Sequence, residues 1–367
     1  MGLTDREREI VDLLRGEPLI GPAEIAERLG STRAAVNVHL SNLGRKGVIL
    51  GRGYILSAQP PVVVVGGANI DIKARSSAAA IGQTSNPGHT STTPGGVARN
   101  IAENLARLGT TTHLIAALGR DAHGERLLTE TREAGVLLDH VHRSGTHPTG
   151  SYTAVLDADG EMLLAVADMS ATDDLRPEHL RSARELILHA ALLVLDGNLP
   201  AATTEHLLDL AQAADVRVVL DPVSVPKAAR LLPLLRADRP IFAMTPNRDE
   251  LRALTGLDTA ADDAGSAAAD VLHERGVEHV WIRLGAQGSL LSGPGGTHRL
   301  PALSAEVRDV TGAGDAMLAA FAHALLAGRS PVLAARYGHA AAALTLESAH
   351  TVRPDLTERL LEERIEI

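Results

Sequence analysis

Apolar side chains recur at helical spacing in three short segments at the start of the chain, and a different pattern follows them. The segments are 4–15, 22–30 and about 33–46, and each opens on residues that favour a helix start: Thr, Pro and Ser-Thr. Two apolar triplets, 48–50 and 54–56, then lie among glycines and predict a short β-hairpin. On or near the apolar face of the third helix we expect Ala35, Val38, Leu40 and Leu43.

The pattern changes at Pro60-Pro61, because paired prolines resist the continuation of a helix or strand. We therefore divide the chain into a small domain at 1–58, a linker at 59–61 and a large domain at 62–367. Val62–Val65 reads as a buried strand, and apolar strands then alternate with helical patterns. This alternation predicts an α/β domain with a mostly parallel sheet and helices on both faces.

Two segments interrupt the alternation. Residues 74–93 are rich in Ser, Thr, Ala and Gly, and residues 151–168 hold two apolar runs that turn at Asp159-Gly160. We expect these segments to leave the main sheet and to form a small β lid from parts of 72–94 and 150–168.

Composition narrows the range of functions. The chain has 367 residues, of which 45% are apolar and only 2% aromatic, and it has no cysteine. The lack of cysteine excludes disulfides, thiol nucleophiles and thiolate zinc sites, and it fits a reducing compartment. Neither an apolar signal core nor a run of membrane-spanning length is found, so we expect a cytoplasmic protein that does not enter a membrane.

Charge differs between the two domains. The whole chain carries −10, yet residues 1–59 hold eight Lys and Arg against seven Asp and Glu, and residues 28–59 hold no acid. Three helices followed by a hairpin resemble a winged helix-turn-helix, in which the third helix would enter the major groove of DNA. Candidate DNA contacts are Arg33, Asn37, Arg45, Lys46 and Arg52, with Thr32, His39 and Asn42 beside them. The alternative is a dimerisation domain with a solvated basic face; the missing acids favour DNA binding.

A glycine-rich turn at 309–315, with the sequence DVTGAGD, leads directly into a run of helix formers. It would place the backbone N–H groups of Gly312, Ala313 and Gly314 at a helix N-terminus, where unpaired donors and the helix dipole favour an anion. Asp315 would lie beside that anion and could accept a proton from a hydroxyl that attacks a phosphoryl group. The alternative is an ordinary turn with an Asp that stabilises the helix.

Polar residues follow several predicted strands, at the edge where open α/β sheets bind ligands. They are Asn69, Asp71, Asp196, Asn198 and Asp221. The chain lacks a Walker A motif, a GxGxxG motif and a protein-kinase glycine loop, so bound phosphates must be held in another way. The sixteen histidines include no HExxH pair, and we do not expect a transition-metal site.

Four segments together resemble the ribokinase-like (PfkB) family of sugar and nucleoside kinases. They are 66–71, 95–100, 245–250 and 309–315, they occur in the family's order, and the resemblance extends over about 60–355. The DVTGAGD motif is specific. The resemblance implies a ribokinase-like fold and phosphoryl transfer from ATP.

The resemblance also implies a role for each matching position. Asp315 is the catalytic base, and Gly312, Ala313 and Gly314 form the anion hole for the γ-phosphate. The substrate-binding positions are Asn69, Asp71, Gly95, Gly96 and Asn100. The ATP-binding positions are Asn247, Glu250, Arg283, Gly285, Gly288 and Thr311. Glu250 would organise Mg²⁺ through water, while Asp309 and Thr311 would bind a monovalent cation, K⁺; Asn247 and Glu250 also fit a helix cap.

Further segments resemble the bacterial pseudouridine kinases within this family. They are 66–71, 85–88, 95–109, 157–162, 168–169 and 221–224. Two small departures are Ala98 in place of a usual Gly and Thr245 in place of a frequent Lys. The resemblance implies phosphorylation of the 5′-hydroxyl of pseudouridine. Candidates for reading the base are Asn86, Asp168 and Asn198, because an amide or carboxylate oxygen could accept the extra ring N–H.

Two other functions stay open at this point. The same fold and phosphate site would serve a kinase for another nucleoside or for ribose. A transcription regulator whose kinase-like domain only senses a sugar or nucleoside is the second alternative. The partners we expect are a nucleoside, DNA at the N-terminal domain, and a second copy of the chain in a homodimer whose lids meet.

Overall fold

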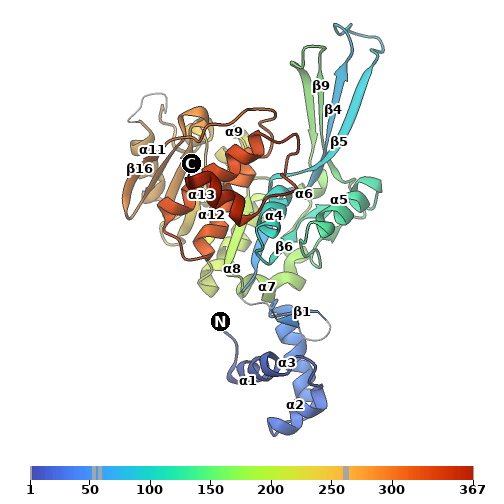
Figure 1. Cartoon of the computed structure of the whole chain (residues 1–367), viewed down its shortest axis with the longest axis vertical. Coiled ribbons are helices and arrows are strands. Elements are labelled where there is room, and N and C mark those ends of the chain that lie inside the picture. Colours follow the sequence, from blue (N-terminus) through green and yellow to red (C-terminus); the bar gives the residue numbers. More distant parts are fainter. Residues whose placement is uncertain (1, 52–54, 57–59, 259–263, 367) are drawn as a thin grey trace.

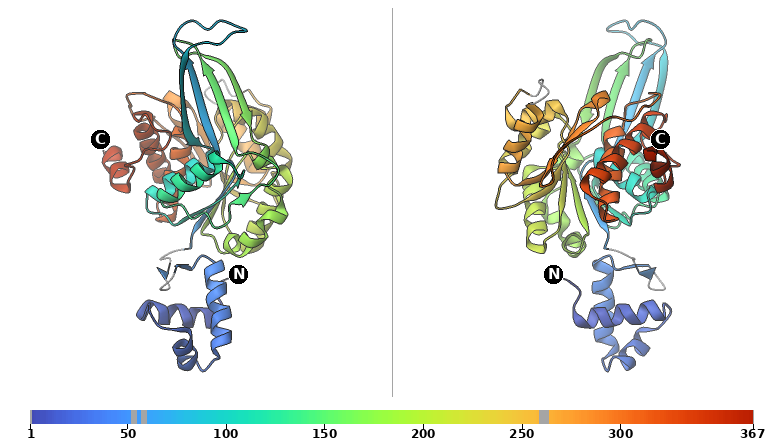
Figure 2. Two further views of the ribbon diagram at one scale, coloured as in Figure 1. Left: turned by 90° about the vertical axis from the view of Figure 1, so that its right-hand side faces the viewer. Right: turned by 60° about the vertical axis from the view of Figure 1, so that its left-hand side comes forward.

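The computed structural model describes residues 2–51, 55–56, 60–258 and 264–366. A small helical domain lies at one end of a larger α/β body, and a β-sheet projects from the body's other end (Figure 1 and Figure 2). Arg52 and part of the expected linker fall outside the described residues. Among the helices that the structure describes, none is long and apolar enough to cross a membrane.

The small domain has the winged helix-turn-helix order that the sequence predicts. Its elements are α1 (Asp5–Gly16), α2 (Pro22–Arg28), α3 (Arg33–Arg45), β1 (Ile49–Gly51) and β2 (Ile55–Leu56). Thr4 and Glu7 form a reciprocal capping box at the start of α1, and the Thr32 hydroxyl accepts the Ala35 N–H at the start of α3. The apolar core of the domain contains Ile10, Leu14, Ile25, Val36, Leu40 and Leu43.

One expectation for α3 is wrong. Val38 is 58% exposed and does not belong to the apolar face. The buried side chains are Val36, Leu40 and Leu43, which follow one another at intervals of four and three residues. A residue two positions after Val36 lies roughly half a turn away from that face.

An eight-stranded sheet forms the centre of the large domain, in the order β16-β15-β14-β13-β12-β11-β3-β6. The strands are β3 (Val62–Val65), β6 (Thr112–Ile115), β11 (Leu192–Asp196), β12 (Val218–Asp221), β13 (Ile241–Met244), β14 (Val277–Arg283), β15 (Ser289–Gly293) and β16 (Gly296–Leu300). The pairs from β6 to β14 are parallel, and those of β15 with β14 and β16 are antiparallel. The chain runs outward from β3 in one direction and from β11 in the other, so a topological switch point lies between these strands.

Helices cover both faces of this sheet, as the sequence predicts. Val62 and Val64 pack into one apolar layer with α4, α12 and α13, and Val63 and Val65 pack into the layer on the other face with α7 to α11. The helices of the large domain are α4 (Val97–Arg107), α5 (Ala122–Glu133), α6 (Ser170–Asp173), α7 (Arg184–Leu188), α8 (Ala201–Ala214), α9 (Val225–Leu231), α10 (Arg248–Thr255), α11 (Ala264–Glu274), α12 (Ala313–Leu326), α13 (Pro331–Leu346) and α14 (Glu358–Glu366). Short 3₁₀ turns lie at Pro177–Ala183, Leu232–Leu234 and Gly285–Gln287, and β7 (Ala117–Leu118) pairs with β8 (His142–Arg143).

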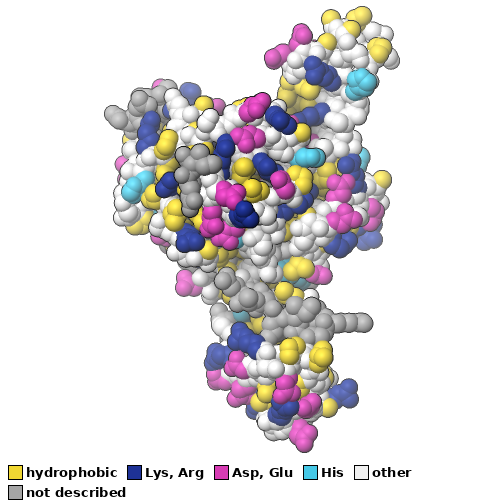
Figure 3. All heavy atoms as spheres, in the orientation of Figure 1, with side chains coloured by type: hydrophobic (Ala, Val, Ile, Leu, Met, Phe, Trp, Pro, Cys, Tyr) yellow, Lys and Arg dark blue, Asp and Glu magenta, His cyan; other side chains and the backbone are white. Residues whose placement is uncertain are grey.

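The projecting sheet has four strands in the order β10-β9-β4-β5. They are β4 (Asn69–Ser76), β5 (Gly88–Gly95), β9 (Gly150–Leu156) and β10 (Met162–Asp168). The hairpin between β9 and β10 turns at the expected place, where Gly160 has a φ of 92°. Apolar side chains on β10 are exposed, and Figure 3 shows hydrophobic groups on the projecting part. The exposed side chains on this edge strand are Met162, Leu163, Leu164 and Val166.

Candidate active site

The glycine-rich turn forms the start of α12, as the sequence predicts. Gly312 is the N-cap and has a φ of 80°, and a side chain on it would collide with the carbonyl group of Thr351. A Cβ on Gly314 would lie 2.6 Å from the guanidinium of Arg283. Position 312 therefore needs glycine, whereas Gly314 lets the Arg283 guanidinium lie close to the N-terminus of this fourteen-residue helix.

Asp315 lies in the first turn of α12, as expected. Its carboxylate accepts a hydrogen bond of 2.8 Å from the side-chain amide of Asn100 on α4. Burial raises the pKa of Asp315 to about 8, and the carboxylates of Asp221 and Asp196 add to this rise, while Asn100 and Arg283 oppose it. A carboxyl group with a pKa near the working pH is suited to accept a proton.

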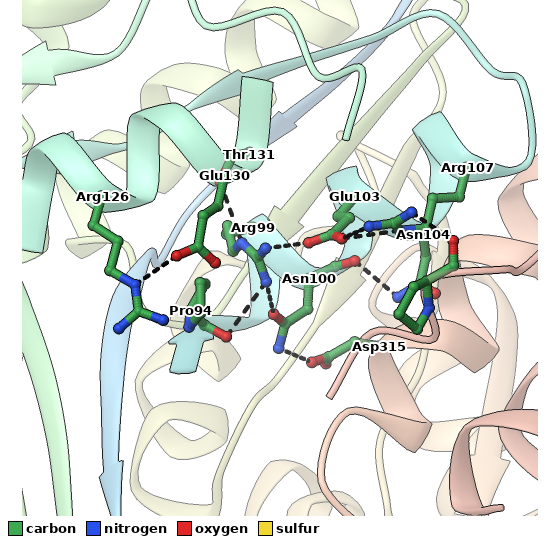
Figure 4. A network of polar contacts seen from close by, with 11 residues as sticks. Pro94, Arg99, Asn100, Glu103, Asn104, Arg107, Arg126, Glu130, Thr131 and Asp315 are labelled. Atoms are coloured by element: carbon green, nitrogen blue, oxygen red, sulfur yellow. Dashed lines mark hydrogen bonds and ion pairs between the residues drawn. The ribbon is translucent and has the colours of Figure 1, made fainter. Parts of the chain in front are cut away.

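A buried arginine fixes the direction of the Asn100 amide (Figure 4). Arg99 donates 3.0 Å to the Asn100 side-chain oxygen, which leaves the amide nitrogen directed at Asp315. Arg99 itself is 5% exposed and pairs with Glu103, and its Nε donates to Thr131. Sequence reasoning missed Arg99; a charged residue inside the apolar start of a helix was the available signal.

A second arginine joins the ends of two strands to the start of a helix. Arg283, at the end of β14, lies 3.1 Å from Asp221 at the end of β12 and 3.3 Å from Glu250 on α10. Asn247 and Glu250 form a reciprocal capping box, which confirms the helix-cap reading of this pair. Glu250 is 2% exposed, and burial raises the pKa of its carboxyl group. The guanidinium of Arg283 therefore lies between buried carboxylates and the turn that holds Gly314.

Asp196, at the end of β11, is a buried anchor of the switch point. Its carboxylate accepts the backbone N–H groups of Gly67, Ala98 and Asn198, at 2.9, 3.0 and 2.9 Å. The Asn198 side chain bonds Asp196 through its amide nitrogen and accepts the ammonium of Lys227 through its oxygen. Asn198, a candidate for reading the base, therefore has one donor and one acceptor position of its amide occupied inside the protein.

Four of the other substrate-binding candidates lie at the start of β4, the end of β5 and the start of α4. The side-chain amide of Asn69 donates 2.7 Å to Asp71, whose pKa burial raises, and a side chain on Gly95 would collide with the Asp71 carboxylate. Gly96 has a φ of 98° and is the N-cap of α4, which carries Asn100. The structure therefore gathers the start of β4, the end of β5 and the start of α4 around one place.

Two candidates for reading the base are engaged locally. The Asn86 side chain bonds both backbone groups of Ile81, within the exposed loop that joins β4 and β5 at the outer end of the projecting sheet (Figure 1). Asp168, at the end of β10, accepts the N–H and the hydroxyl of Ser170 at 3.0 and 2.5 Å. The structure does not bring Asn86 near Asp315 within one chain.

Asp309 bonds residues of its own chain. One carboxylate oxygen accepts the N–H and the hydroxyl of Thr311, at 2.8 and 2.6 Å, and the other accepts the ammonium of Lys73 at 2.9 Å. Partial burial raises the pKa of Asp309, but these hydrogen bonds outweigh it and lower the pKa overall. No local pattern marks Lys73 as part of this site, because its partner lies 236 residues away in the chain.

A cavity of about 720 Å³ opens beside the start of α12. Gly285, Gly288 and Arg283 line it on one side, with Ala313 and Gly314 beside them, and most of its wall is apolar. The remaining lining residues include Ala302, Leu303, Val307, Val310, Met317, His339, Ala343 and Leu346. An apolar wall that ends at a helix N-terminus suits a base joined to phosphates.

The small domain presents part of the expected DNA-binding set. Arg33, Asn37 and Arg45 on α3 are exposed, and Arg45 bonds Asn42. Lys46 is a wrong assignment: it is 9% exposed, and its ammonium lies 2.8 Å from the buried carboxylate of Glu7. It follows the last turn of α3 on the side that packs against α1, so it closes the domain core rather than facing a groove.

The other candidates beside α3 are less available. Thr32 caps the helix, Asn42 is partly buried, and His39 has a buried ring nitrogen without a partner in the structure. Figure 3 shows Lys and Arg mixed with Asp and Glu over this domain. The exposed cations of α3 therefore form the candidate interface.

Comparison with known proteins assigns each of the two domains to a known family. A model described as pfkB family carbohydrate kinase matches residues 59–358, and one described as winged helix-turn-helix DNA-binding matches residues 3–49. The chain is 35% identical over 356 residues to the uncharacterized sugar kinase YeiI of Escherichia coli K12, with 97% of both chains covered. It is also 35% identical over 297 residues to the pseudouridine kinase of the same bacterium, covering 81% of this chain and 93% of that one.

Solved structures agree with this assignment. The ribokinase of Arabidopsis thaliana, determined with ribose and ATP, superimposes with a TM-score of 0.75 at 28% identity, covering 84% of this chain and 99% of the ribokinase. A carbohydrate kinase from Agrobacterium tumefaciens gives a TM-score of 0.73 at 32% identity, covering 84% and 97%.

Proposed function

Because this chain belongs to the pfkB family of carbohydrate kinases and carries a winged helix-turn-helix domain, we propose that it phosphorylates the 5′-hydroxyl of pseudouridine with ATP. The observation that carries the catalytic part is the placement of Asp315 between the Asn100 amide and a helix N-terminus. The segments shared with pseudouridine kinases, and the 35% identity to one of them, support the choice of nucleoside.

The proposed reaction depends on position and charge. The 5′-hydroxyl lies near Asp315 and transfers its proton to the carboxylate as its oxygen attacks the γ-phosphorus, and the bond from that phosphorus to the β-phosphate oxygen breaks to release ADP. Charge on the transferred phosphoryl group meets the N–H groups at 312–314 and the dipole of α12. The adenine base and the α- and β-phosphates occupy the 720 Å³ cavity beside Arg283.

The residues present fit Mg²⁺ bound together with ATP. Within the described chain, no three His, Cys, Asp or Glu gather as a preformed metal site. Mg²⁺ usually keeps several waters and takes one or two carboxylates besides the phosphates. The buried carboxylates near Arg283 are therefore enough protein ligands for it. Glu250 would hold it through water, and the metal would neutralise charge on the phosphates.

The projecting sheet acts as a lid in this proposal. Asp71, at its base, binds the ribose with Asn100, and Asp168 is the base-reading candidate that lies at an inner strand end. The exposed apolar side chains of β10 meet those of a second copy, which covers them and forms a homodimer. Closure of the lid would exclude water from the phosphoryl transfer.

A panel of acceptors tests the choice of substrate. ATP consumption by the purified protein is measured with Mg²⁺ for pseudouridine, uridine, cytidine, adenosine, inosine and ribose. We expect the highest kcat/KM for pseudouridine. A preference for another acceptor would overturn the substrate while keeping the site, and binding without turnover for all six would favour the sugar-sensing regulator.

A further inference from the structure

Lys73 links the lid to the loop that leads into the anion hole. It lies on β4, two residues after Asp71, and alternate residues of a strand point to the same face. Its ammonium lies 2.9 Å from Asp309, which belongs to the loop before α12. The ion pair therefore joins two elements that are 236 residues apart in sequence.

The hydrogen bonds at Asp309 do not fit the K⁺ that the family resemblance implies. A carboxylate offers about four acceptor positions, and three at Asp309 are filled by the Thr311 N–H, the Thr311 hydroxyl and the Lys73 ammonium. A second cation on the same group would lie within a few ångströms of the ammonium, where like charges repel. The Thr311 hydroxyl is also turned toward Asp309 as a donor.

The ion pair between Lys73 and Asp309 is held in place at both ends, although both side chains are partly exposed. The side chains of Lys73 and Asp309 keep 41% and 33% of their exposure, which alone would make a weak ion pair. Both ends, however, are attached to fixed backbone: β4 pairs with β5 and β9 on either side, and Thr311 holds the Asp309 carboxylate twice. Little side-chain freedom remains to be lost at the Asp309 end.

We propose that Lys73 supplies from within the chain the positive charge that a bound K⁺ would bring to Asp309, so that phosphoryl transfer in this kinase does not depend on a monovalent cation. The inference rests on the proposed kinase function of the same site. It also makes the lid part of the anion-hole structure, because Lys73 fixes the Asp309 loop only when β4 is in place.

The test compares KCl with tetramethylammonium chloride at one ionic strength, because salt itself screens exposed charges. Thermal unfolding of the wild type, Lys73→Met and Arg75→Met is measured in both salts without substrate. Arg75 is the matched control, since it lies on the same strand and bonds the carbonyl of Ala158 in the lid instead of Asp309. Turnover with the preferred nucleoside is measured in the same salts.

We expect the wild type and Arg75→Met to unfold at the same temperature, within about 1 °C, in both salts and to keep at least half of their kcat/KM without K⁺. Lys73→Met should unfold several degrees higher in K⁺ and regain turnover with K⁺ by about tenfold or more. A wild type that is stabilised by K⁺, or that loses turnover tenfold without it, would overturn the proposal. So would a Lys73→Met protein that matches the wild type in both salts.

The two readouts separate this proposal from the choice of substrate. Unfolding temperatures need no nucleoside, so they decide the cation question even if no acceptor in the panel is turned over. If Lys73→Met is inactive in both salts, the comparison of the wild type in KCl and in tetramethylammonium chloride alone tests the proposal.

Discussion

The carboxyl group of Asp315 lies among charges of both signs. Burial and the neighbouring carboxylates raise its pKa to about 8, and the Asn100 amide and the Arg283 guanidinium limit the rise. At neutral pH in the free protein the group is therefore mostly protonated, and its ability to accept a proton increases with pH.

The first prediction is a pH profile. Because kcat/KM reports the groups of the free enzyme, it should rise about tenfold per pH unit below 8 and level off above that value. Initial rates at low nucleoside concentration between pH 6 and 9.5 measure this. A flat profile from pH 6 to 8 would show that no group with this pKa takes part.

The second prediction concerns Asn100→Ala. The Asn100 amide donates to the Asp315 carboxylate and stabilises its charged form, so its removal should raise the pKa of Asp315 and move the rising limb of kcat/KM to higher pH. Asn104→Ala is the matched control, because Asn104 bonds the Asn100 carbonyl and not Asp315. An unchanged limb in Asn100→Ala, or an equal shift in both variants, would contradict the assignment.

At the scale of elements, α3 carries two kinds of cation that the sequence could not tell apart. Arg33 is exposed, whereas Lys46 is buried against Glu7. Removal of one partner of a buried pair leaves an uncompensated charge, which costs about 3–5 kcal/mol. Removal of an exposed groove contact costs binding rather than stability.

The third prediction follows from this difference. Arg33→Ala should weaken binding to a duplex, selected from a random pool by the wild type, by about 1–3 kcal/mol without loosening the domain. Lys46→Met should instead speed hydrogen–deuterium exchange in α1 and α3, and Arg45→Met, one residue away and exposed, is its control. Normal exchange in Lys46→Met, or full DNA affinity in Arg33→Ala, would contradict these roles.

Whether a feature can be predicted from the sequence depends on whether the residues that stabilise it are near or distant in the chain. The helix starts at Thr4, Thr32 and Gly312 and the buried strands could be predicted from the sequence, because capping residues and apolar runs act locally. Side chains that are held by partners far away in the sequence could not be predicted. Lys46 meets Glu7 across 39 residues and Lys73 meets Asp309 across 236, so no local pattern marks either residue as paired.

The candidate site shows the same limit. Two residues that the family resemblance assigns separately, Asp315 and Asn100, are hydrogen-bonded to each other. Asn198 reads as a free amide at a strand end, yet the fold occupies it with Asp196 and Lys227. Arg99 became visible as a positioning residue only when its partners were in view.

At the scale of the molecule, the small domain and the projecting sheet lie at opposite ends of the α/β body (Figure 2). The small domain therefore does not cover the proposed active site, and DNA binding and catalysis can occur in the same protein. The exposed apolar residues of β10 lie on an edge strand, a place that soluble proteins usually protect.

The fourth prediction is that these residues hold a dimer. Leu164 is 61% exposed, and Leu164→Asp should convert a wild-type dimer to a monomer in sedimentation velocity and raise the KM for the nucleoside. Val225→Asp, at a 45% exposed apolar site on α9, is the control and should stay dimeric. A monomeric wild type at micromolar concentration, or a dimeric Leu164→Asp, would contradict this interface.

The proposed role of Asp315 as the base in phosphoryl transfer is tested by the kcat of Asp315→Ala with the nucleoside that the wild type prefers. We expect a loss of at least ~100-fold in kcat, the scale of general-base catalysis, with an ATP dissociation constant close to that of the wild type. A kcat within a few-fold of the wild type, with ATP still bound, would show that another group accepts the proton.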